Sequence, residues 1–246
     1  DINSDSRILK ELESLSKNKK VRITALGVHM NEENKKYKKI EHVKIYSINL
    51  NSRKLIFLPA FIKHSLSVIE LTLKMIFNSF KAKPSIIHCH DTLVLPLGVL
   101  VKLFTGSKLI YDAHELESNR NGLSNTLGKM TFFVEKLLWR FIDKIIVVSP
   151  SISDWYQKNI GIKSTEIIMN SPILSENNFD IKNDKLYFRN KFNIPDSSKI
   201  FLYIGILSEG RGIDLLIEAF KKIDLSSHLI FLGYGEFKNR LVELSK

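Results

Sequence analysis

A glycine-rich turn follows an apolar segment near the end of the sequence, in LYIGILSEGRGIDLLIEAF at Leu202–Phe220. Gly205, Gly210 and Gly212 allow the backbone to approach a ligand without a Cβ clash, and the helix expected after them offers free N–H groups and a positive dipole end. Arg211 adds a fork-shaped cation to the same turn. The combination predicts a phosphate-binding site, although glycines in such a turn also serve simply to permit tight packing.

Polar side chains also lie where two other apolar segments end. His90 and Asp91 close the segment IIHCHD, and Asp112, His114 and Glu115 close the segment YDAHE. If both segments are parallel strands, these side chains lie at the edge of the sheet where open α/β folds bind ligands. His90, Asp91 and Asp112 are therefore candidate cleft residues, with a structural cap as the alternative for Asp112. A carboxylate beside an imidazole fixes its tautomer, so Glu115 is expected to orient His114.

Strand-like and helical patterns alternate through residues 1–170, which favours a parallel sheet with helices on both sides. The expected strands are 21–26, 43–48, 86–89, 108–111, 144–148 and 166–169. The expected helices are 6–16, 58–80, 93–104, 126–141 and 151–158. The fold class is therefore α/β.

A polar, loop-like segment at 171–196 precedes a second group of elements. These are a strand at 199–204, a helix at 213–223, a strand at 228–232 and a helix at 236–246. We expect an N-terminal Rossmann-like domain at 1–170, an interdomain connection at 171–196, and the start of a second domain at 197–246.

Six motifs occur in an order that points to a known family: IIHCHD, YDAHE, VVSPSI, MNSP, the glycine-rich turn and FLGYGE. In this order and spacing, the chain resembles the retaining, nucleotide-sugar-dependent glycosyltransferases of family 4 over nearly its whole length. The resemblance implies the GT-B architecture, in which two Rossmann-like, doubly wound domains hold the donor between them. It also implies that the first strand and most of the C-terminal domain lie outside this sequence, so that the chain by itself is expected to be inactive.

The resemblance assigns roles to individual residues. His114 matches a histidine that commonly contacts the transferred sugar and is, with Glu115 beside it, the candidate catalytic residue; a loop-capping role is the alternative. Arg211 matches the lysine or arginine that binds the donor diphosphate. The family often has a second arginine directly after the first glycine, and Ile206 stands there instead. Diphosphate binding is therefore expected to rely more heavily on Arg211.

A pair of histidines, His88 and His90, raises the question of a metal site, because residues two apart on a strand point to the same side. Asp112 or His114 would have to complete the set of ligands. The family that the chain resembles acts without a bound divalent ion, so no metal and no cofactor are expected. His88 is then expected to be a packed strand residue.

The implied reaction transfers a sugar from a nucleoside-diphosphate sugar to the hydroxyl of a glycan or lipid-linked acceptor, with retention, in the synthesis of cell-surface polysaccharide or glycolipid. Arg211 and helix N–H groups would stabilise charge on the leaving diphosphate. Gly233 and Gly235 would allow close approach to the nucleotide or form a plain tight turn. Two alternatives share the architecture: a sugar-nucleotide epimerase and a non-catalytic partner subunit.

The composition narrows the cellular setting. With 246 residues, of which 44% are hydrophobic, the chain can bury a large core. No apolar run approaches the roughly 18 residues that span a bilayer, and no secretory signal pattern occurs. The single cysteine, Cys89, excludes an internal disulfide framework. These observations favour a cytoplasmic location.

The formal charge of +11 invites a nucleic-acid or membrane interpretation. The lysines are scattered and no nucleic-acid motif occurs, so no nucleic-acid partner is expected. The expected helix 58–80 carries an apolar stripe with lysines nearby, at Phe61, Leu66, Ile69, Leu73 and Ile76. Core packing is the expected use of the stripe, and peripheral contact with the anionic inner face of a membrane is the alternative.

Overall fold

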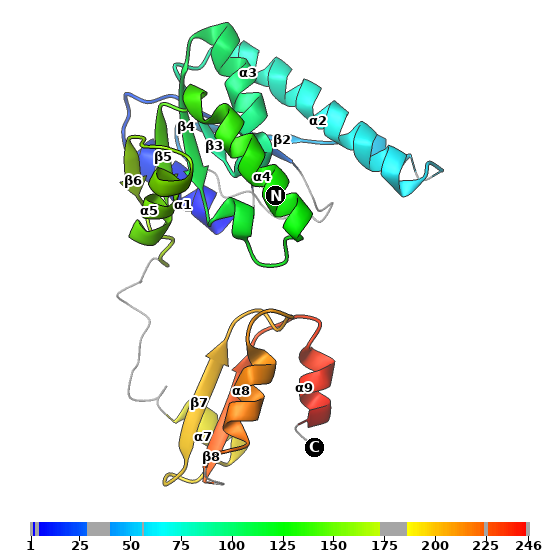
Figure 1. The fold of residues 1–246 in the computed structure, drawn as a ribbon, viewed down its shortest axis with the longest axis vertical. Coiled ribbons are helices and arrows are strands. Elements are labelled where there is room, and N and C mark those ends of the chain that lie inside the picture. The colour runs from blue at the N-terminus through cyan, green and yellow to red at the C-terminus, as the bar shows by residue number, and fades with distance from the viewer. Residues whose placement is uncertain are drawn as a thin grey trace. The chain divides into compact units, whose positions relative to one another are not determined.

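The computed structural model describes residues 2, 5–28, 40–55, 57–172, 186–223 and 226–244. The chain divides into two compact units, residues 1–171 and 172–246, and each contains its own parallel strands (Figure 1). Residues 173–185 of the expected connection and the last two residues of the expected final helix lie outside the described residues.

The first unit contains a four-stranded parallel sheet in the order β3-β4-β5-β6 and a parallel pair, β1-β2. The strands are β1 (Ile23–Val28), β2 (Val43–Ile48), β3 (Ile86–His90), β4 (Lys108–Ala113), β5 (Lys144–Val147) and β6 (Thr165–Ile167). Every strand predicted in this region is present, and the α/β class is confirmed.

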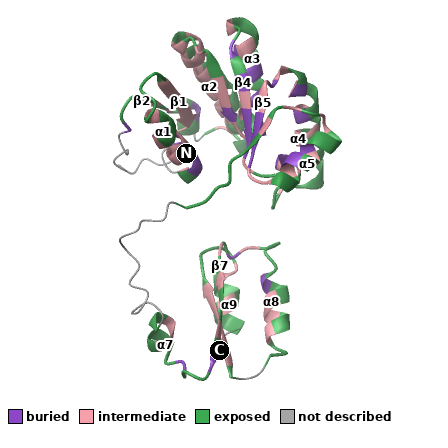
Figure 2. Ribbon diagram, turned by 90° about the vertical axis from the view of Figure 1, so that its left-hand side faces the viewer, coloured by how far each residue is buried: buried purple, intermediate pink, exposed green. Residues whose placement is uncertain are grey.

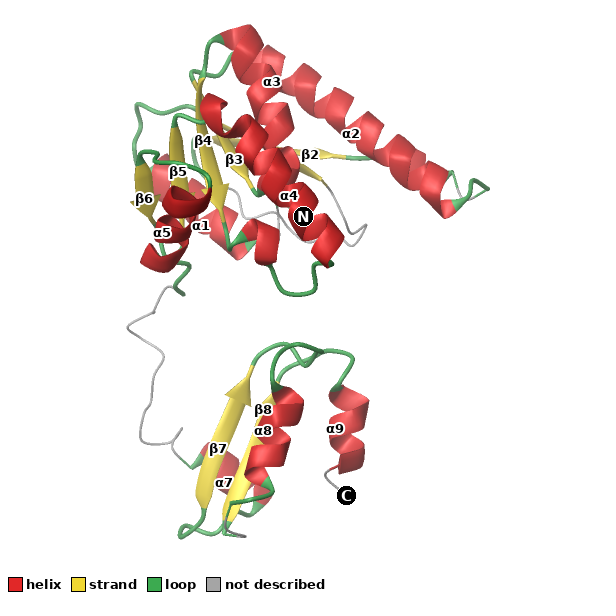
Figure 3. Cartoon of the chain, in the orientation of Figure 1, coloured by secondary structure: helices red, strands yellow, loops and turns green. Residues whose placement is uncertain are grey.

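The helices of the first unit are α1 (Ser6–Ser16), α2 (Ala60–Ala82), α3 (Leu95–Thr105), α4 (Asn125–Leu138) and α5 (Pro150–Asn159). Side-chain caps explain where three of them begin: the carboxylate of Asp5 accepts the first free N–H groups of α1, and Ser124 and Ser149 cap α4 and α5. Helix α3 packs on β3 and β4, and α5 packs on β5 and β6 (Figure 3).

Strands β4 and β5 form the centre of the core. Leu109, Tyr111 and Ala113 of β4 and Ile145 and Val147 of β5 are fully buried, as the purple central strands of Figure 2 show. Burial of apolar side chains is the main favourable term in folding, so these strands are the most rigid part of the unit. Side chains that directly follow their ends are held by that rigid base.

A buried carboxyl joins three elements around this core. Glu135 of α4 is fully buried, and its Oε1 accepts hydrogen bonds from the hydroxyls of Tyr111 on β4 and Tyr156 on α5, each at 2.6 Å. The hydroxyl of Thr92 lies 3.3 Å from the same oxygen. Burial raises the pKa of Glu135, although the three hydroxyls oppose that shift. A buried polar network of this kind favours one arrangement of the three elements.

Helix α2 contacts α3 and the pair β1-β2, and it is also held to the loop before it by polar side chains. The carboxylate of Glu70 accepts the backbone N–H groups of Asn51 and Ser52 at 2.9 and 2.8 Å, both in the short helix η1 (Asn51–Lys54). Lys74 Nζ donates to the carbonyl of Asn49 at 2.7 Å and to Glu70 at 2.6 Å. Polar contacts with the preceding loop therefore anchor this helix.

The apolar side of α2 faces away from the core. The exposed fractions are 81% for Phe61, 38% for Leu66, 55% for Ile69, 61% for Leu73 and 70% for Phe77. The expectation that the stripe packs in the core is thus wrong for its first four residues, because these side chains stay exposed while polar side chains hold the helix to the loop before it. The N-terminal half of the helix also projects beyond the rest of the unit (Figure 1). Among the described helices, none is long and apolar enough to cross a membrane.

In the described part of the second unit, a short helix precedes a strand, helix and strand, and a further helix follows them. Its elements are α7 (Tyr187–Phe192), β7 (Lys199–Ile204), α8 (Ile213–Phe220), β8 (Ser227–Leu232) and α9 (Lys238–Leu244). Strands β7 and β8 pair in parallel. Ile213 of α8 is buried, whereas Ile223, predicted inside this helix, lies beyond its end and is 41% exposed.

Asp143 provides a test of how the first unit responds to acid. Its carboxylate accepts hydrogen bonds from Lys102 of α3 and from the N–H of Leu109. Burial opposes ionisation, but these bonds outweigh it and lower the pKa of Asp143 from 3.8 to about 2. A carboxyl with a lowered folded-state pKa stabilises the protein above its unfolded pKa, and this stabilisation disappears as the pH falls through the folded value.

We predict that Asp143→Asn lowers the free energy of unfolding by about 1–2 kcal/mol at neutral pH. The difference from the unsubstituted protein should narrow between about pH 4 and pH 2. Urea unfolding over the pH range in which both proteins remain folded measures it, with the exposed Asp154→Asn as the control. A difference that stays constant with pH would contradict the prediction.

Candidate active site

The carboxyl ends of β3 and β4 lie side by side, and chemically active residues follow both. His90 pairs in register with Asp112. The N–H of Asp91, the first residue after β3, donates to the carbonyl of Asp112 at 3.1 Å. His114 directly follows β4. The structure therefore gathers His90, Asp91, Asp112 and His114 at one edge of the sheet.

A buried ion pair lies beneath this edge. Arg7 of α1 is 4% exposed, and its Nη2 lies 2.8 Å from Oδ1 and 3.1 Å from Oδ2 of Asp112, which is fully buried. The Nε of Arg7 lies 3.2 Å from the same Oδ2, and its Nη1 donates to the carbonyl of Ile168 at 2.9 Å. This pairing corrects the interpretation of Asp112 as a cleft residue or cap, because its carboxylate is committed to Arg7.

Burial alone would raise the pKa of Asp112, but hydrogen bonds from His114, His88, His90 and Arg7 together hold it well below its usual range. Asp112 is therefore a carboxylate at neutral pH. It provides a fixed negative charge for the histidines above it.

His114 is held between two neighbours. Its Nδ1 lies 3.4 Å from Oδ1 of Asp91, and its Nε2 lies 3.0 Å from Nδ1 of His90. Burial would lower the pKa of His114, but the hydrogen bond to Asp112 and the charge of Asp91 raise it overall. Glu115 is exposed and has no hydrogen bond or ion pair with His114 in the described structure. The expectation that Glu115 orients His114 is therefore wrong, and Asp91 takes that place.

Asp91 itself has an unusual backbone. Its φ of 67° lies in the left-handed region that non-glycine residues rarely adopt. Strain of this kind persists only where surrounding contacts enforce it, and it is concentrated at functional sites. Glu117, only 3% exposed, interacts with Asp91; burial first and then the charge of Asp91 raise the pKa of Glu117 to about 8. At neutral pH, Glu117 is therefore mostly protonated.

The glycine-rich turn of the second unit leads from β7 to α8. Gly210 and Gly212 have φ values of 76° and 70°, and Gly212 is the residue that caps α8. Arg211 between them is exposed and forms no hydrogen bond or ion pair in the described structure. Asp214 in the first turn of α8 is paired with Arg240 at 2.8 Å. The acidic side chain in the first turn of α8 is thus paired with a cation.

The second pair of glycines has a structural reason. A Cβ at Gly233 would lie 1.9 Å from the carbonyl oxygen of Gly205, and one at Gly235 would lie 2.2 Å from that of Leu207. The N–H of Leu207 donates to the carbonyl of Tyr234 at 2.8 Å. The two turns therefore interlock through their backbones, as the tight-turn alternative for Gly233 and Gly235 requires.

Sequence reasoning missed three residues at the strand ends. Arg7 and Glu11 of α1 are one turn apart, with Nε of Arg7 3.1 Å from Oε1 of Glu11, and Glu117 follows β4 by four residues. Each of the first two immediately precedes an apolar residue of α1, Ile8 or Leu12, and these two residues, four apart, form an apolar stripe of which Leu12 is buried. That position at the border of the stripe was the available signal.

A model of known families now places the chain. The model described as Glycosyltransferase Family 4 matches residues 20–171, which is more than half of the chain. The chain belongs to glycosyltransferase family 4. The strand-end residues of the first unit lie within the matched region.

Curated relatives of this family 4 chain are longer than it is. An uncharacterized glycosyltransferase of Methanocaldococcus jannaschii is 26% identical over 217 residues, covering 85% of this chain and 54% of the relative. The O-antigen biosynthesis glycosyltransferase WclY of Escherichia coli is 30% identical over 109 residues, covering 44% of this chain and 30% of WclY. The family 4 chain thus spans about half of the first relative and a third of the second.

Solved structures agree on the fold. Sucrose-phosphate synthase from Thermosynechococcus elongatus matches 91% of this chain and 55% of its own, with a TM-score of 0.65 and 17% identity. Anabaena HepE, in complex with UDP, matches 83% of this chain and 52% of its own, with a TM-score of 0.57 and 19% identity. At this identity the likeness concerns the fold alone, and it confirms the predicted GT-B type for this family 4 chain.

We predict that Arg7→Met destabilises the protein by about 3–5 kcal/mol, because it leaves the carboxylate of Asp112 buried without its partner. Arg7→Lys should cost less, since it keeps the charge and loses only the bidentate geometry. Denaturant unfolding measures both. Arg22→Met, at an exposed position, is the matched control and should change stability by less than about 0.5 kcal/mol. Equal stability of Arg7→Met and the control would show that the pair is not an anchor.

Proposed function

We propose that this chain forms part of a retaining glycosyltransferase that moves a sugar from a nucleoside-diphosphate sugar to an acceptor hydroxyl in polysaccharide or glycolipid synthesis. The observation that carries the proposal is the cluster at the ends of β3 and β4 in a family 4 chain, with His114 held by Asp91 and His90. Two comparisons support the substrate class: HepE binds UDP and UDP-glucose in its solved structures, and WclY is an O-antigen biosynthesis enzyme.

In the proposed reaction, the bond between the anomeric carbon and the diphosphate oxygen breaks, and the acceptor oxygen bonds to that carbon on the same face. The acceptor proton passes to the leaving phosphate oxygen. Negative charge grows on the diphosphate, and we assign its stabilisation to Arg211 and the N–H groups at the start of α8. Arg211 forms no ion pair in the described structure, so its charge is available for this role. The proposal assigns no cofactor to the reaction.

We assign His114 to the transferred sugar. Its side chain is 17% exposed, so it is accessible at the strand ends, and contacts to Asp91 and His90 restrict its ring orientation. Both ring nitrogens already have a neighbour, so a hydrogen bond to a sugar hydroxyl replaces one of these two contacts while the other keeps the ring in place. Glu115 does not orient His114, but its exposed carboxylate remains a candidate for direct contact with the substrate.

We predict that, in the whole protein, Arg211→Ala lowers kcat/KM by roughly 10²–10³, as the loss of one preorganised transition-state donor does. Arg211→Lys should lose less, because it keeps the charge. His114→Ala should also lower turnover while the melting temperature changes little. Kinetics with a panel of nucleoside-diphosphate sugars, read beside melting curves, provide the measurement. The exposed Lys222→Ala in the same unit is the control, and turnover of Arg211→Ala equal to that control would place the diphosphate elsewhere.

We further propose that the exposed apolar side of α2 contacts an anionic membrane, which would bring the protein to a lipid-linked acceptor. Seven apolar residues of this helix are at least 38% exposed: Phe61, Ile62, Leu66, Val68, Ile69, Leu73 and Phe77. Exposed lysines lie at both ends, at Lys54 before the helix and at Lys81 and Lys83 at its end. An apolar face flanked by cations is typical of helices that lie in the membrane interface.

The proposal predicts flotation of the protein with vesicles that contain phosphatidylglycerol and little flotation with pure phosphatidylcholine. Replacing Phe61, Leu73 and Phe77 together by Ser should weaken the association at least about tenfold, since each buried side chain is worth about 1.5–3 kcal/mol. Ile162→Ser, at a position that is 87% exposed outside α2, is the matched control. Binding that is the same for the triple variant and the control, or independent of anionic lipid, would remove this proposal.

A further inference from the structure

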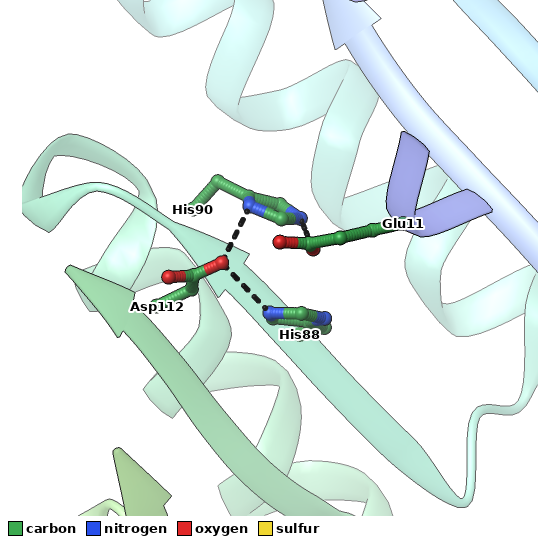
Figure 4. Close-up of side chains that lie close together, drawn as sticks. All are labelled: Glu11, His88, His90 and Asp112. Atoms are coloured by element: carbon green, nitrogen blue, oxygen red, sulfur yellow. Dashed lines mark ion pairs between the residues drawn. The ribbon is translucent and has the colours of Figure 1, made fainter. Parts of the chain in front are cut away.

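Four side chains with metal-binding chemistry converge beneath the strand ends (Figure 4). Glu11 comes from α1, His88 and His90 come from β3, and Asp112 comes from β4; one ligand atom of each lies within 4.8 Å of the others. We call these four residues the histidine-carboxylate cluster. Its members come from three elements, so the fold, and not a local sequence motif, brings them together.

Several atoms of the cluster have no hydrogen-bond partner in the described structure. Both carboxylate oxygens of Glu11 and Nε2 of His88 are shielded from solvent and form no hydrogen bond within the described residues, although Oε1 of Glu11 is in an ion pair with Arg7 at 3.1 Å and Nε2 of His88 lies 3.5 Å from Oδ2 of Asp112. A shielded polar atom without a partner costs about 1–3 kcal/mol, and more when it is charged. Oε2 of Glu11 and Nε2 of His88 are thus available to a group that accepts their lone pairs.

The distances suit a small cation. Nε2 of His88 lies 3.5 Å from Oδ2 of Asp112, and Nε2 of His90 lies 3.8 Å from Oε2 of Glu11. Ligands arranged tetrahedrally at about 2.0–2.1 Å from a zinc ion stand about 3.4 Å apart. Because the ligand atoms of the cluster lie within 4.8 Å of one another, some pairs have to approach by up to about 1.4 Å to complete the coordination of an ion.

The charges also favour a cation. Arg7 balances Asp112, and its Nε faces Oε1 of Glu11 at 3.1 Å. With neutral histidines, the two carboxylates and Arg7 leave one net negative charge. Oε2 of Glu11, on the side of His90, is directed away from that ion pair and towards the imidazoles. Two imidazoles and carboxylate oxygen are the ligands that zinc and its neighbours in the first transition series prefer.

We propose that Glu11, His88 and His90 bind a divalent transition-metal cation of the zinc class, with Oδ2 of Asp112 as the fourth ligand. The cation joins α1 to β3 and β4. This site differs from the expectation that no metal is bound, which rested on the family that the chain resembles.

The cation has a consequence for the residue above it. When Nε2 of His90 binds the ion, its Nδ1 carries the proton, which faces Nε2 of His114 at 3.0 Å and Oδ2 of Asp112 at 3.4 Å. The cation then positions His114 through His90 and does not contact the diphosphate. This consequence rests on the proposed role of His114, whereas the cation site itself does not.

The test is a titration of the tag-free, metal-stripped chain with Co²⁺, followed by displacement with Zn²⁺. The visible absorption of Co²⁺ reports nitrogen and oxygen coordination in a tetrahedral site, independently of any activity. We expect saturation at one ion per chain and a melting temperature that rises with the concentration of Zn²⁺. Glu11→Gln and His88→Gln, each checked for native circular dichroism, should weaken Zn²⁺ binding more than about 100-fold, beyond the loss typical of residues that only support a ligand.

His64→Gln is the matched control, because His64 is an exposed histidine on α2 outside the cluster. It should bind Zn²⁺ as the unsubstituted chain does. Failure of the unsubstituted chain to take up Co²⁺ or Zn²⁺ overturns the proposal, whatever the variants do. Equal Zn²⁺ affinity of His88→Gln and the control also overturns it. So does a melting temperature that rises on mild acidification and does not respond to Zn²⁺, because protons would then occupy the cluster. Loss of turnover in His114→Ala with intact Zn²⁺ binding separates the enzymatic role from the cation site.

Discussion

The arrangement of the residues at the ends of β3 and β4 depends on the ion pair between Arg7 and Asp112. A guanidinium that is 4% exposed donates to both oxygens of a fully buried carboxylate and also to the carbonyl of Ile168, which follows β6. Desolvating two charges is expensive, and only complete hydrogen bonding makes it tolerable. Because the pairing is complete, Asp112 stays ionised and its charge reaches all three histidines above the sheet. The first helix and the site therefore form one electrostatic unit.

The periodicity of the sequence predicted where the helices and strands lie, but not which side of each one packs against the rest of the protein. The helix 6–16 and the strands 43–48 and 199–204 have the predicted ends, because caps and short β-branched runs are local signals. Helix α2 shows the limit of this reasoning. An apolar stripe reveals that a helix has two sides, yet Glu70 and Lys74 pair with the loop before the helix, and no local pattern announces such a partner.

The candidate site was predictable where residues follow a strand and not where tertiary contacts place them. His90, Asp91 and His114 could be read from the ends of apolar runs, since parallel strands share an edge. The pairing of His114 with Asp91 in place of its sequence neighbour Glu115 could not, because adjacent residues at a strand end point in different directions. Glu117 stays hidden for a similar reason: its raised pKa comes from burial, which composition does not reveal.

The interlocked turns of the second unit distinguish residues that the packing of the backbone requires from residues that it does not require. Gly233 and Gly235 are needed by the carbonyl groups of Gly205 and Leu207, whether or not a nucleotide ever binds. A relative that had lost its donor would still have to keep this glycine pair in order to fold. The pair therefore reports on the packing of the two turns, whereas the proposed contact with a diphosphate depends on Arg211, which forms no hydrogen bond or ion pair in the described structure.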